Sequence, residues 1–372
     1  MINCLESDLQ VYFIPHLSHN IQHFSHFNTD ISIMESTLKL LITVQFSPEL
    51  ISQIESVSPH LVVTTIGAKE SGDVPEEAWQ EADILYTHKA LPDPDSAPQL
   101  KWIQFHRAGN EMFMEAPILR KPGLVATSMS GASAPQVAEY VLEMILALGH
   151  RLSQILAHQS RAEWPAERGE IFQPLELNQS TVGIVGYGSI GRQVAKLLRA
   201  FGATVLATKR DAMRPTDGGY IPEGIGDPEC DYLQRLYPAE ALKSMLKECD
   251  YVVVCVPLTK HTRALIGEAQ LAVMKQSAFL VDVSRGGVIN HADLIPALED
   301  GQIAGAALDV YPEEPLPEDN PLWKMPNVII TPHIAGVSRE YDRRAVALFV
   351  ENLERYLDGR QLLNLIDLQR GY

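Results

Sequence analysis

The sequence predicts an α/β protein with two domains, each built around a parallel β-sheet. The chain has 372 residues, which is more than one hydrophobic core usually serves. Short apolar runs alternate with helical segments along it, as they do where strands are buried on both faces of a sheet. Two such series are separated by a polar, irregular stretch at residues 158–178. We interpret this stretch as the crossing between the domains.

The first series predicts a domain of residues 37–150, completed by residues 333–372. Its predicted strands lie at residues 40–44, 61–65 and 84–86. Between Val137 and Leu148, apolar side chains recur at intervals of three and four residues, as on the buried face of a helix. A second long helix is expected at about residues 339–358, after the chain returns from the other domain, with Gly359 at its end.

The second series predicts a domain of residues 151–332. Strands are expected at residues 181–185, 204–207, 251–256, 278–283, 304–310 and 328–331. Residues 210–238 are rich in Pro and Gly and show little periodicity. They predict a loop rather than a further strand or helix.

Composition excludes several classes of partner. The net charge of −17 disfavours binding to nucleic acid, and no apolar stretch is long enough to span a bilayer. The four cysteines have no metal-ligand or disulfide spacing, which favours a reducing cytoplasm. Residues 1–36 are polar and contain four histidines at no known ligand spacing, so we interpret them as a disordered leader and predict no metal site.

The strand at residues 181–185 runs into the motif Gly186-Tyr-Gly188-Ser189-Ile190-Gly191, and a helix follows. In this motif the first glycine permits a tight turn, the second lets the backbone approach a pyrophosphate, and the third allows close packing of helix on strand. The start of the helix offers unpaired N–H groups to the phosphates. The order strand, glycines, helix and second strand therefore predicts a Rossmann-like domain that binds NAD or NADP.

The end of the next strand indicates which dinucleotide is preferred. A site for NAD normally carries Asp or Glu there, about 20 residues after the glycines, to bind the ribose hydroxyls. This chain has Thr208-Lys209-Arg210 instead. Because Lys and Arg pair with a 2′-phosphate, Lys209 and Arg210 favour NADP, with NAD as the alternative.

Four further blocks follow in order. They read Cys249-Asp-Tyr-Val-Val-Val-Cys-Val256-Pro257-Leu-Thr-x-x-Thr262, Val281-Asp-Val-Ser-Arg285-Gly-Gly, Asp309-Val-Tyr-Pro-Glu-Glu314-Pro and Thr331-Pro-His333-Ile-Ala-Gly. Together with the glycine-rich turn, they resemble the signatures of the D-isomer-specific 2-hydroxyacid dehydrogenases, especially glyoxylate and hydroxypyruvate reductases. The resemblance covers about residues 38–360. It implies two Rossmann-like domains, one flavodoxin-like for the substrate and one for the dinucleotide, with the active site in the cleft between them.

The chemistry of 2-keto acid reduction assigns roles to three residues. Arg285 can hold a carboxylate with both arms of its guanidinium and polarise the adjacent carbonyl. His333 can give a proton to the developing alkoxide, and as neutral imidazole it can take the proton back. Glu314 can orient that ring and favour its protonated form. The resemblance places the functional Arg, Glu and His on these same positions, with Glu313 as the rival of Glu314.

The resemblance also implies contacts with cofactor and substrate. Val256, Pro257 and Thr262 would line the cofactor, and Asp309 would lie near the nicotinamide carboxamide. Arg107, Ala108 and Gly109 resemble the loop whose backbone N–H groups meet the substrate carboxylate. Arg107 and Asn110 depart from the usual residues of that loop, so Arg107 is either a second cation for a larger or dianionic substrate or a solvated side chain.

These expectations favour an NAD(P)-dependent 2-hydroxyacid dehydrogenase, acting as a reductase on a small 2-keto acid. An enzyme similar to 3-phosphoglycerate dehydrogenase is an alternative, although only 39 residues follow His333, which leaves no room for a C-terminal regulatory domain. A second alternative is a dinucleotide-sensing scaffold similar to a corepressor. The resemblance further implies a homodimer formed through the cofactor domains.

Overall fold

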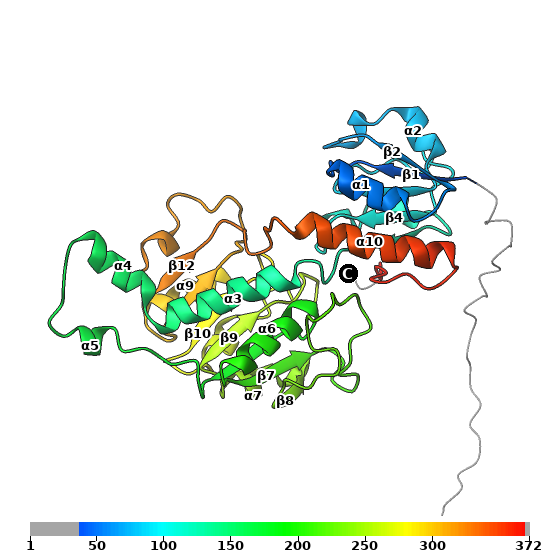
Figure 1. Ribbon diagram of the computed structural model, residues 1–372. Coiled ribbons are helices and arrows are strands. Elements are labelled where there is room, and N and C mark those ends of the chain that lie inside the picture. Colours follow the sequence, from blue (N-terminus) through cyan, green and yellow to red (C-terminus); the bar gives the residue numbers. More distant parts are fainter. Residues whose placement is uncertain (1–36, 369–372) are drawn as a thin grey trace, which may run out of the picture.

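The computed structural model describes residues 37–368, which form two α/β domains joined by two crossings of the chain (Figure 1). The expected leader at residues 1–36 lies outside the described residues. Each domain contains one sheet, and all the paired strands of both sheets are parallel. The predicted fold class is confirmed.

The first sheet has the strand order β2-β1-β3-β4-β5, which is the order of flavodoxin-like folds. Its strands are β1 (Leu38–Ile42), β2 (Leu61–Thr65), β3 (Ile84–Thr87), β4 (Trp102–Phe105) and β5 (Val125–Thr127). Strands β4 and β5 were not predicted from the sequence. Both are short, and β4 is buried along its whole length, so no alternation of polar and apolar residues marks it.

The helices of the first domain include one from the far end of the chain. They are α1 (Pro48–Glu55), α2 (Glu76–Glu81) and α10 (Tyr341–Leu357), with the 3-10 turns η2 (Ser71–Asp73), η3 (Glu111–Phe113) and η4 (Pro117–Arg120). Helix α10 packs beside α1 on the first sheet. Its Phe349 and Leu353 are fully buried in the same cluster as Tyr86 and Trp102, and Gly359 follows the helix with a φ of 66°.

The second sheet has the order β12-β11-β10-β9-β6-β7-β8. Its strands are β6 (Thr181–Val185), β7 (Thr204–Lys209), β8 (Arg235–Pro238), β9 (Tyr251–Val254), β10 (Phe279–Asp282), β11 (Gly305–Leu308) and β12 (Val328–Ile330). From β8 at one edge to β11, the order of six strands is that of a Rossmann fold, with the change of direction between β6 and β9, and β12 is added beyond β11. All six predicted strands are present. The expectation of a loop throughout residues 210–238 is wrong at its end, because β8 pairs there with β7.

The helices of the second domain cover both faces of its sheet. They are α3 (Ala134–Gly149), α4 (Leu152–Ser160), α5 (Arg168–Ile171), α6 (Ser189–Ala200), α7 (Leu242–Leu246), α8 (Glu268–Leu271) and α9 (His291–Glu299), with η5 (Ala239–Ala241) and η6 (Pro321–Lys324). Figure 1 shows α3 beside α6 over the second sheet, and α4 and α5 projecting away from it.

Helix α3 packs on the second sheet, whereas the expected boundary at residue 150 places it with the first domain. Its Val141 and Ile145 are fully buried in one cluster with Val182 and Ile184 of β6. The expected boundary at residue 150 therefore separates α3 from the sheet that it covers. Hydrophobic periodicity predicted the helix but carried no information on which of the two sheets its apolar face meets.

Candidate active site

A cleft of about 720 Å³ is lined by residues of both domains. The first domain contributes His106, Arg107, Ala108, Gly109 and Glu111, and the second contributes Ile190, Leu258, Arg285, Asp309 and Glu314 among others, while His333 lies where the chain returns to the first domain. The three residues with predicted chemical roles, Arg285, Glu314 and His333, therefore line one cavity.

The side chains of His333 and Glu314 form a hydrogen-bonded pair. His333 Nδ1 lies 2.8 Å from Glu314 Oε2, and Glu314 Oε1 accepts a hydrogen bond of 3.0 Å from the backbone N–H of Tyr311. The imidazole is 46% exposed. When Nδ1 donates to the carboxylate, Nε2 is the ring nitrogen available to a molecule in the cleft. Glu314 rather than its neighbour Glu313 makes this contact.

The loop that carries His333 is held by a buried carboxylate. Asp309 is 1% exposed. Its Oδ1 accepts hydrogen bonds from Thr331 Oγ1 at 2.6 Å and from the backbone N–H of Ile334 at 2.8 Å, and its Oδ2 accepts one from the N–H of Ala335 at 2.9 Å. His333 itself has a φ of 53°, a left-handed conformation that this framework supports. Asp309 also lines the cleft, so a contact with the cofactor is compatible with its position.

Arg285 reaches across the cleft to the first domain. It follows β10 by three residues, and its Nη1 donates a hydrogen bond of 2.7 Å to the carbonyl oxygen of Ser284. A Cβ atom built on Gly109 would lie 2.0 Å from Arg285 Nη2. The guanidinium therefore rests directly on the backbone of the loop that was predicted to bind substrate, and only glycine leaves room for it there.

The glycine-rich turn has the geometry of a phosphate cradle. Gly186 has a φ of 108°, and a Cβ on Gly191 would lie 2.3 Å from the carbonyl oxygen of Gly186. A Cβ on Gly188, in contrast, would meet nothing within 4 Å. The turn is therefore closed toward the protein and open at Gly188. Helix α6 begins at Ser189, and Ile190 in its first turn lines the cleft. These residues fit a dinucleotide.

Lys209 and Arg210 lie at the end of β7, as predicted, but the two cations differ in their surroundings. The ammonium of Lys209 donates hydrogen bonds to the carbonyl oxygens of Arg214, Pro215 and Thr216, so it holds the following loop. Burial is the main cause that lowers the pKa of Lys209. Arg210 is exposed.

The residues after β9 form a turn braced by Thr262. Its Oγ1 donates a hydrogen bond of 2.6 Å to the carbonyl oxygen of Pro257 and accepts one of 2.8 Å from the N–H of Thr259. Val256 contacts the glycine-rich turn, since its Cγ1 lies 2.7 Å from the position of a Cβ on Gly186. The structure thus brings Val256 beside Gly186, while Thr262 supports the turn through its hydrogen bond to Pro257.

The loop of Arg107, Ala108 and Gly109 follows β4 and lines the cleft, with the first two residues exposed. Asn110 is buried and donates hydrogen bonds from Nδ2 to the carbonyl oxygens of Arg107 and Ala108. Asn110, which departs from the usual residue of the family loop, therefore stabilises the turn. The side chain of Arg107 stands at the cleft.

His106 and Glu111 flank this loop and were not predicted as site residues. His106 Nδ1 lies 2.8 Å from Tyr86 Oη, and its Nε2 lies 3.5 Å from Asp342 Oδ1. Burial is the main cause that lowers the pKa of His106 to about 3, so the ring is neutral at pH 7. Glu111 Oε1 lies 3.4 Å from Arg285 Nε. No sequence signal marks either residue, because both contacts join segments far apart in the chain.

A second group of contacts that the sequence did not predict anchors the loop between β7 and β8. Arg192 is fully buried. Its guanidinium donates hydrogen bonds to the carbonyl oxygens of Pro215 and Asp227 and lies 4.6 Å from the ring centroid of Tyr187. The backbone N–H of Tyr220 then donates a hydrogen bond of 3.1 Å to Asn364 Oδ1 in the other domain. The loop therefore connects the glycine-rich turn to the first domain.

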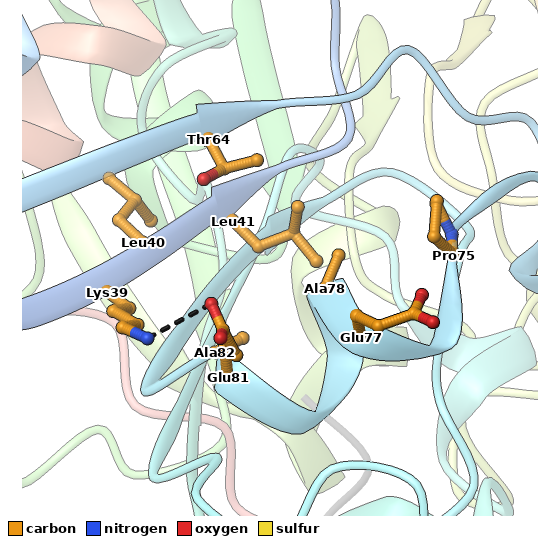
Figure 2. A pocket seen from close by; sticks show the side chains of 9 residues that line it. All are labelled: Lys39, Leu40, Leu41, Thr64, Pro75, Glu77, Ala78, Glu81 and Ala82. Atoms are coloured by element: carbon orange, nitrogen blue, oxygen red, sulfur yellow. Dashed lines mark ion pairs between the residues drawn. The ribbon is translucent and has the colours of Figure 1, made fainter.

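A smaller pocket of about 300 Å³ lies on the first domain, away from this chemistry (Figure 2). Figure 2 draws the side chains that line it, and the one ion pair drawn among them joins Lys39 to Glu81. The lining of this pocket includes none of the residues with predicted chemical roles. Within residues 37–368, no cluster of three or more His, Cys, Asp or Glu side chains is arranged to bind a metal, and none of the helices in that range has the length and apolarity needed to cross a membrane.

Comparison with known proteins agrees with this geometry. Residues 142–335 match the model of the D-isomer specific 2-hydroxyacid dehydrogenase family, NAD binding domain. The chain is 31% identical over 335 residues to D-3-phosphoglycerate dehydrogenase of Methanocaldococcus jannaschii, covering 89% of this chain but only 60% of that protein. It is 32% identical over 298 residues to glyoxylate reductase of Aeropyrum pernix, covering 77% of this chain and 84% of that protein.

A solved structure has a similar fold over most of this chain. The D-isomer specific 2-hydroxyacid dehydrogenase from Xanthobacter autotrophicus Py2, in complex with NADPH and MES, superimposes with a TM-score of 0.73 at 27% identity, covering 91% of this chain and all of that one. The match to the family model spans more than half of the chain. The chain therefore belongs to the D-isomer specific 2-hydroxyacid dehydrogenase family, NAD(P)-dependent oxidoreductases that act on the CH–OH group of their donors.

Proposed function

We propose that this enzyme reduces small 2-keto acids such as glyoxylate or hydroxypyruvate, with His333 as the acid and base and NADPH as the preferred cofactor. The observation that carries the proposal is the convergence of Arg285 with the pair formed by His333 and Glu314 in one cleft next to the glycine-rich turn. The names of the relatives support the substrate class, since glyoxylate reductase is among them.

The roles of the residues follow from their positions. NADPH supplies a hydride when it is bound. Arg285 binds the substrate carboxylate and polarises the carbonyl group, and the backbone of Ala108 and Gly109 supports the same carboxylate from the other domain. His333 gives the proton on Nε2 to the carbonyl oxygen as negative charge develops there. Glu314, bonded to Nδ1, stabilises the protonated imidazole before the transfer and fixes its orientation.

The preference for NADPH is proposed from the end of β7, where Lys209 and Arg210 stand in place of the acidic residue that normally binds the ribose in an NAD site. The roles of the two cations there differ. Lys209 uses its ammonium to hold the loop at residues 214–216, so its charge acts on a 2′-phosphate from a fixed position. Arg210, at the exposed end of the strand, is the residue that we propose to contact the phosphate, since a guanidinium can bind it with two hydrogen bonds.

We further propose that the protein is a homodimer formed through the second domain. Helices α4 and α5 project from that domain (Figure 1). They and the segment between them expose large apolar side chains, namely Leu152, Ile155, Leu156, Trp164 and Ile171, with Trp164 84% exposed. Several large apolar side chains exposed on one projecting segment are typical of an interface with a second copy.

The described thiols Cys230, Cys249 and Cys255 are unpaired, which supports a reducing compartment such as the cytoplasm.

The proposal is tested by measuring the oxidation of NADPH and NADH side by side with a panel of 2-keto acids. We expect turnover with glyoxylate or hydroxypyruvate, and a higher kcat/KM with NADPH. Cofactor binding without turnover of any acid in the panel would refute the proposed reaction and favour the dinucleotide-sensing scaffold. Equal kcat/KM values for the two cofactors would refute only the proposed preference for NADPH over NADH.

A further inference from the structure

One carboxylate in the cleft has no part in the proposed chemistry. Glu111 belongs to the first domain and lines the cleft. Its Oε1 lies 3.4 Å from Nε of Arg285, which belongs to the second domain, and the two side chains are 28% and 34% exposed. The pair therefore joins the two domains across the cavity in which substrate is expected to bind.

The backbone at Glu111 is firmly placed, so this contact follows from the fold. Glu111 opens the turn η3, directly after Asn110, whose amide donates to the carbonyl oxygens of Arg107 and Ala108. Phe113 at the end of that turn stacks on Phe105 of β4, with ring centroids 5.2 Å apart and an angle of 10° between the planes. The turn thus presents the carboxylate toward the cleft from a rigid base.

The groups around Arg285 show what this carboxylate does. The guanidinium lies against Gly109, at the loop proposed to bind the substrate carboxylate, while Glu111 holds its Nε. A 2-keto acid would offer Arg285 the same chemical group, a carboxylate, at the same place. Two carboxylates repel each other and compete for one guanidinium, so substrate binding and the pair with Glu111 oppose each other.

We propose that Glu111 is an internal competitor for the substrate carboxylate, which weakens the binding of 2-keto acids and links the two domains while the cleft is free of substrate. The proposal rests on the proposed role of Arg285 in binding the substrate carboxylate. It makes Glu111 a residue that sets affinity rather than a catalytic residue, since its carboxylate meets Arg285 and not the reacting carbonyl.

The test compares wild type with Glu111→Gln, which removes the charge and keeps the shape. The probe is oxamate, an unreactive analogue of a 2-keto acid, and its Kd is measured by calorimetry on the NADPH-bound enzyme. We expect oxamate to bind about two- to fivefold more tightly to the variant, the range for a partly exposed ion pair. The KM for glyoxylate should fall by a similar factor while kcat stays within about twofold, because uniform binding is changed.

Glu115→Gln is the matched control. Glu115 is 89% exposed, pairs with Arg120 and lies in the same segment outside the cleft lining. Removing its charge should therefore leave the Kd for oxamate and the KM for glyoxylate unchanged. Unchanged or weaker binding of oxamate to Glu111→Gln would overturn the proposal, as would the absence of oxamate binding to both proteins. Tighter oxamate binding to the variant in an enzyme that reduces none of the 2-keto acids would uphold the competition and refute only the proposed reaction.

Discussion

At the scale of single residues, the contact between Gly109 and Arg285 shows how a backbone position decides chemistry. The loop after β4 approaches the guanidinium so closely that any Cβ at position 109 would overlap it. The atoms that would be displaced are the far end of a flexible side chain, so a larger residue would move Arg285 rather than unfold the domain. Gly109 therefore controls the position of the guanidinium more than it controls stability.

The variant Gly109→Ala should raise the KM for glyoxylate by about tenfold, equivalent to about 1.4 kcal/mol of lost binding, because the displaced guanidinium no longer meets the substrate carboxylate in its proper position. The temperature of unfolding should change little. Steady-state kinetics and thermal unfolding measure the two effects. Gly72→Ala serves as the control, since a Cβ there meets nothing within 4 Å, and a KM equal to that of the control would show that Gly109 has no such role.

The sequence predicted Arg285, Glu314 and His333 because each lies in an ordered block with its own pattern, and the structure brings all three to one cavity. It could not predict Glu111 or the surroundings of His106. Their partners, Arg285 and Asp342, lie more than 170 residues away along the chain. Contacts of this kind depend on how two domains fold together, and neither composition nor periodicity reports on that.

At the scale of secondary structure, elements with regular burial were predictable and short or irregular ones were not. All six predicted strands of the second sheet are present because each is a continuous apolar run. Strand β8 was missed since it lies on the edge of the sheet, and only Tyr237 among its residues is buried. The preceding loop was predicted from its Pro and Gly content, but its anchoring by the buried Arg192 was not, since an Arg in an amphipathic helix usually faces solvent.

The segment of α4 and α5 gives a prediction at this scale. The variant Leu156→Glu places a charge in its exposed apolar surface, where Leu156 is 51% exposed. If this surface is the dimer interface, the unpaired charge should prevent association, so that the variant has the mass of a monomer where the wild type has the mass of a dimer. Light scattering coupled to size exclusion measures the mass.

The control for this experiment is Gln154→Glu, which adds the same charge at a partly exposed polar position on the face of α4 opposite to Leu152, Ile155 and Leu156. The control should keep the mass of two chains. A single-chain mass for the wild-type protein, or an unchanged mass for Leu156→Glu, would contradict the proposed interface.

At the scale of the whole molecule, two sheets of different order place one cleft between them. The change of direction between β6 and β9 opens the second sheet at its carboxyl edge, which is where dinucleotides bind in such folds. The first domain faces this edge, and hydrogen bonds between residues far apart in the chain hold its two sequence segments together. Tyr341 Oη, for example, donates a hydrogen bond of 2.6 Å to the carbonyl oxygen of His106. The fold class was predictable from alternating elements, but the assignment of α3 to the second sheet required the packing itself.

The central claim is that His333, oriented by Glu314, is the acid that completes the reduction. It is tested most directly by the rate constant of a single turnover in His333→Asn with NADPH and glyoxylate. Asn tolerates the left-handed backbone at this position, so the fold should persist. We predict a rate constant about 10²- to 10⁴-fold below that of the wild type, with the Kd for NADPH unchanged. A rate constant within a few-fold of the wild-type value, at the same NADPH affinity, would contradict the claim.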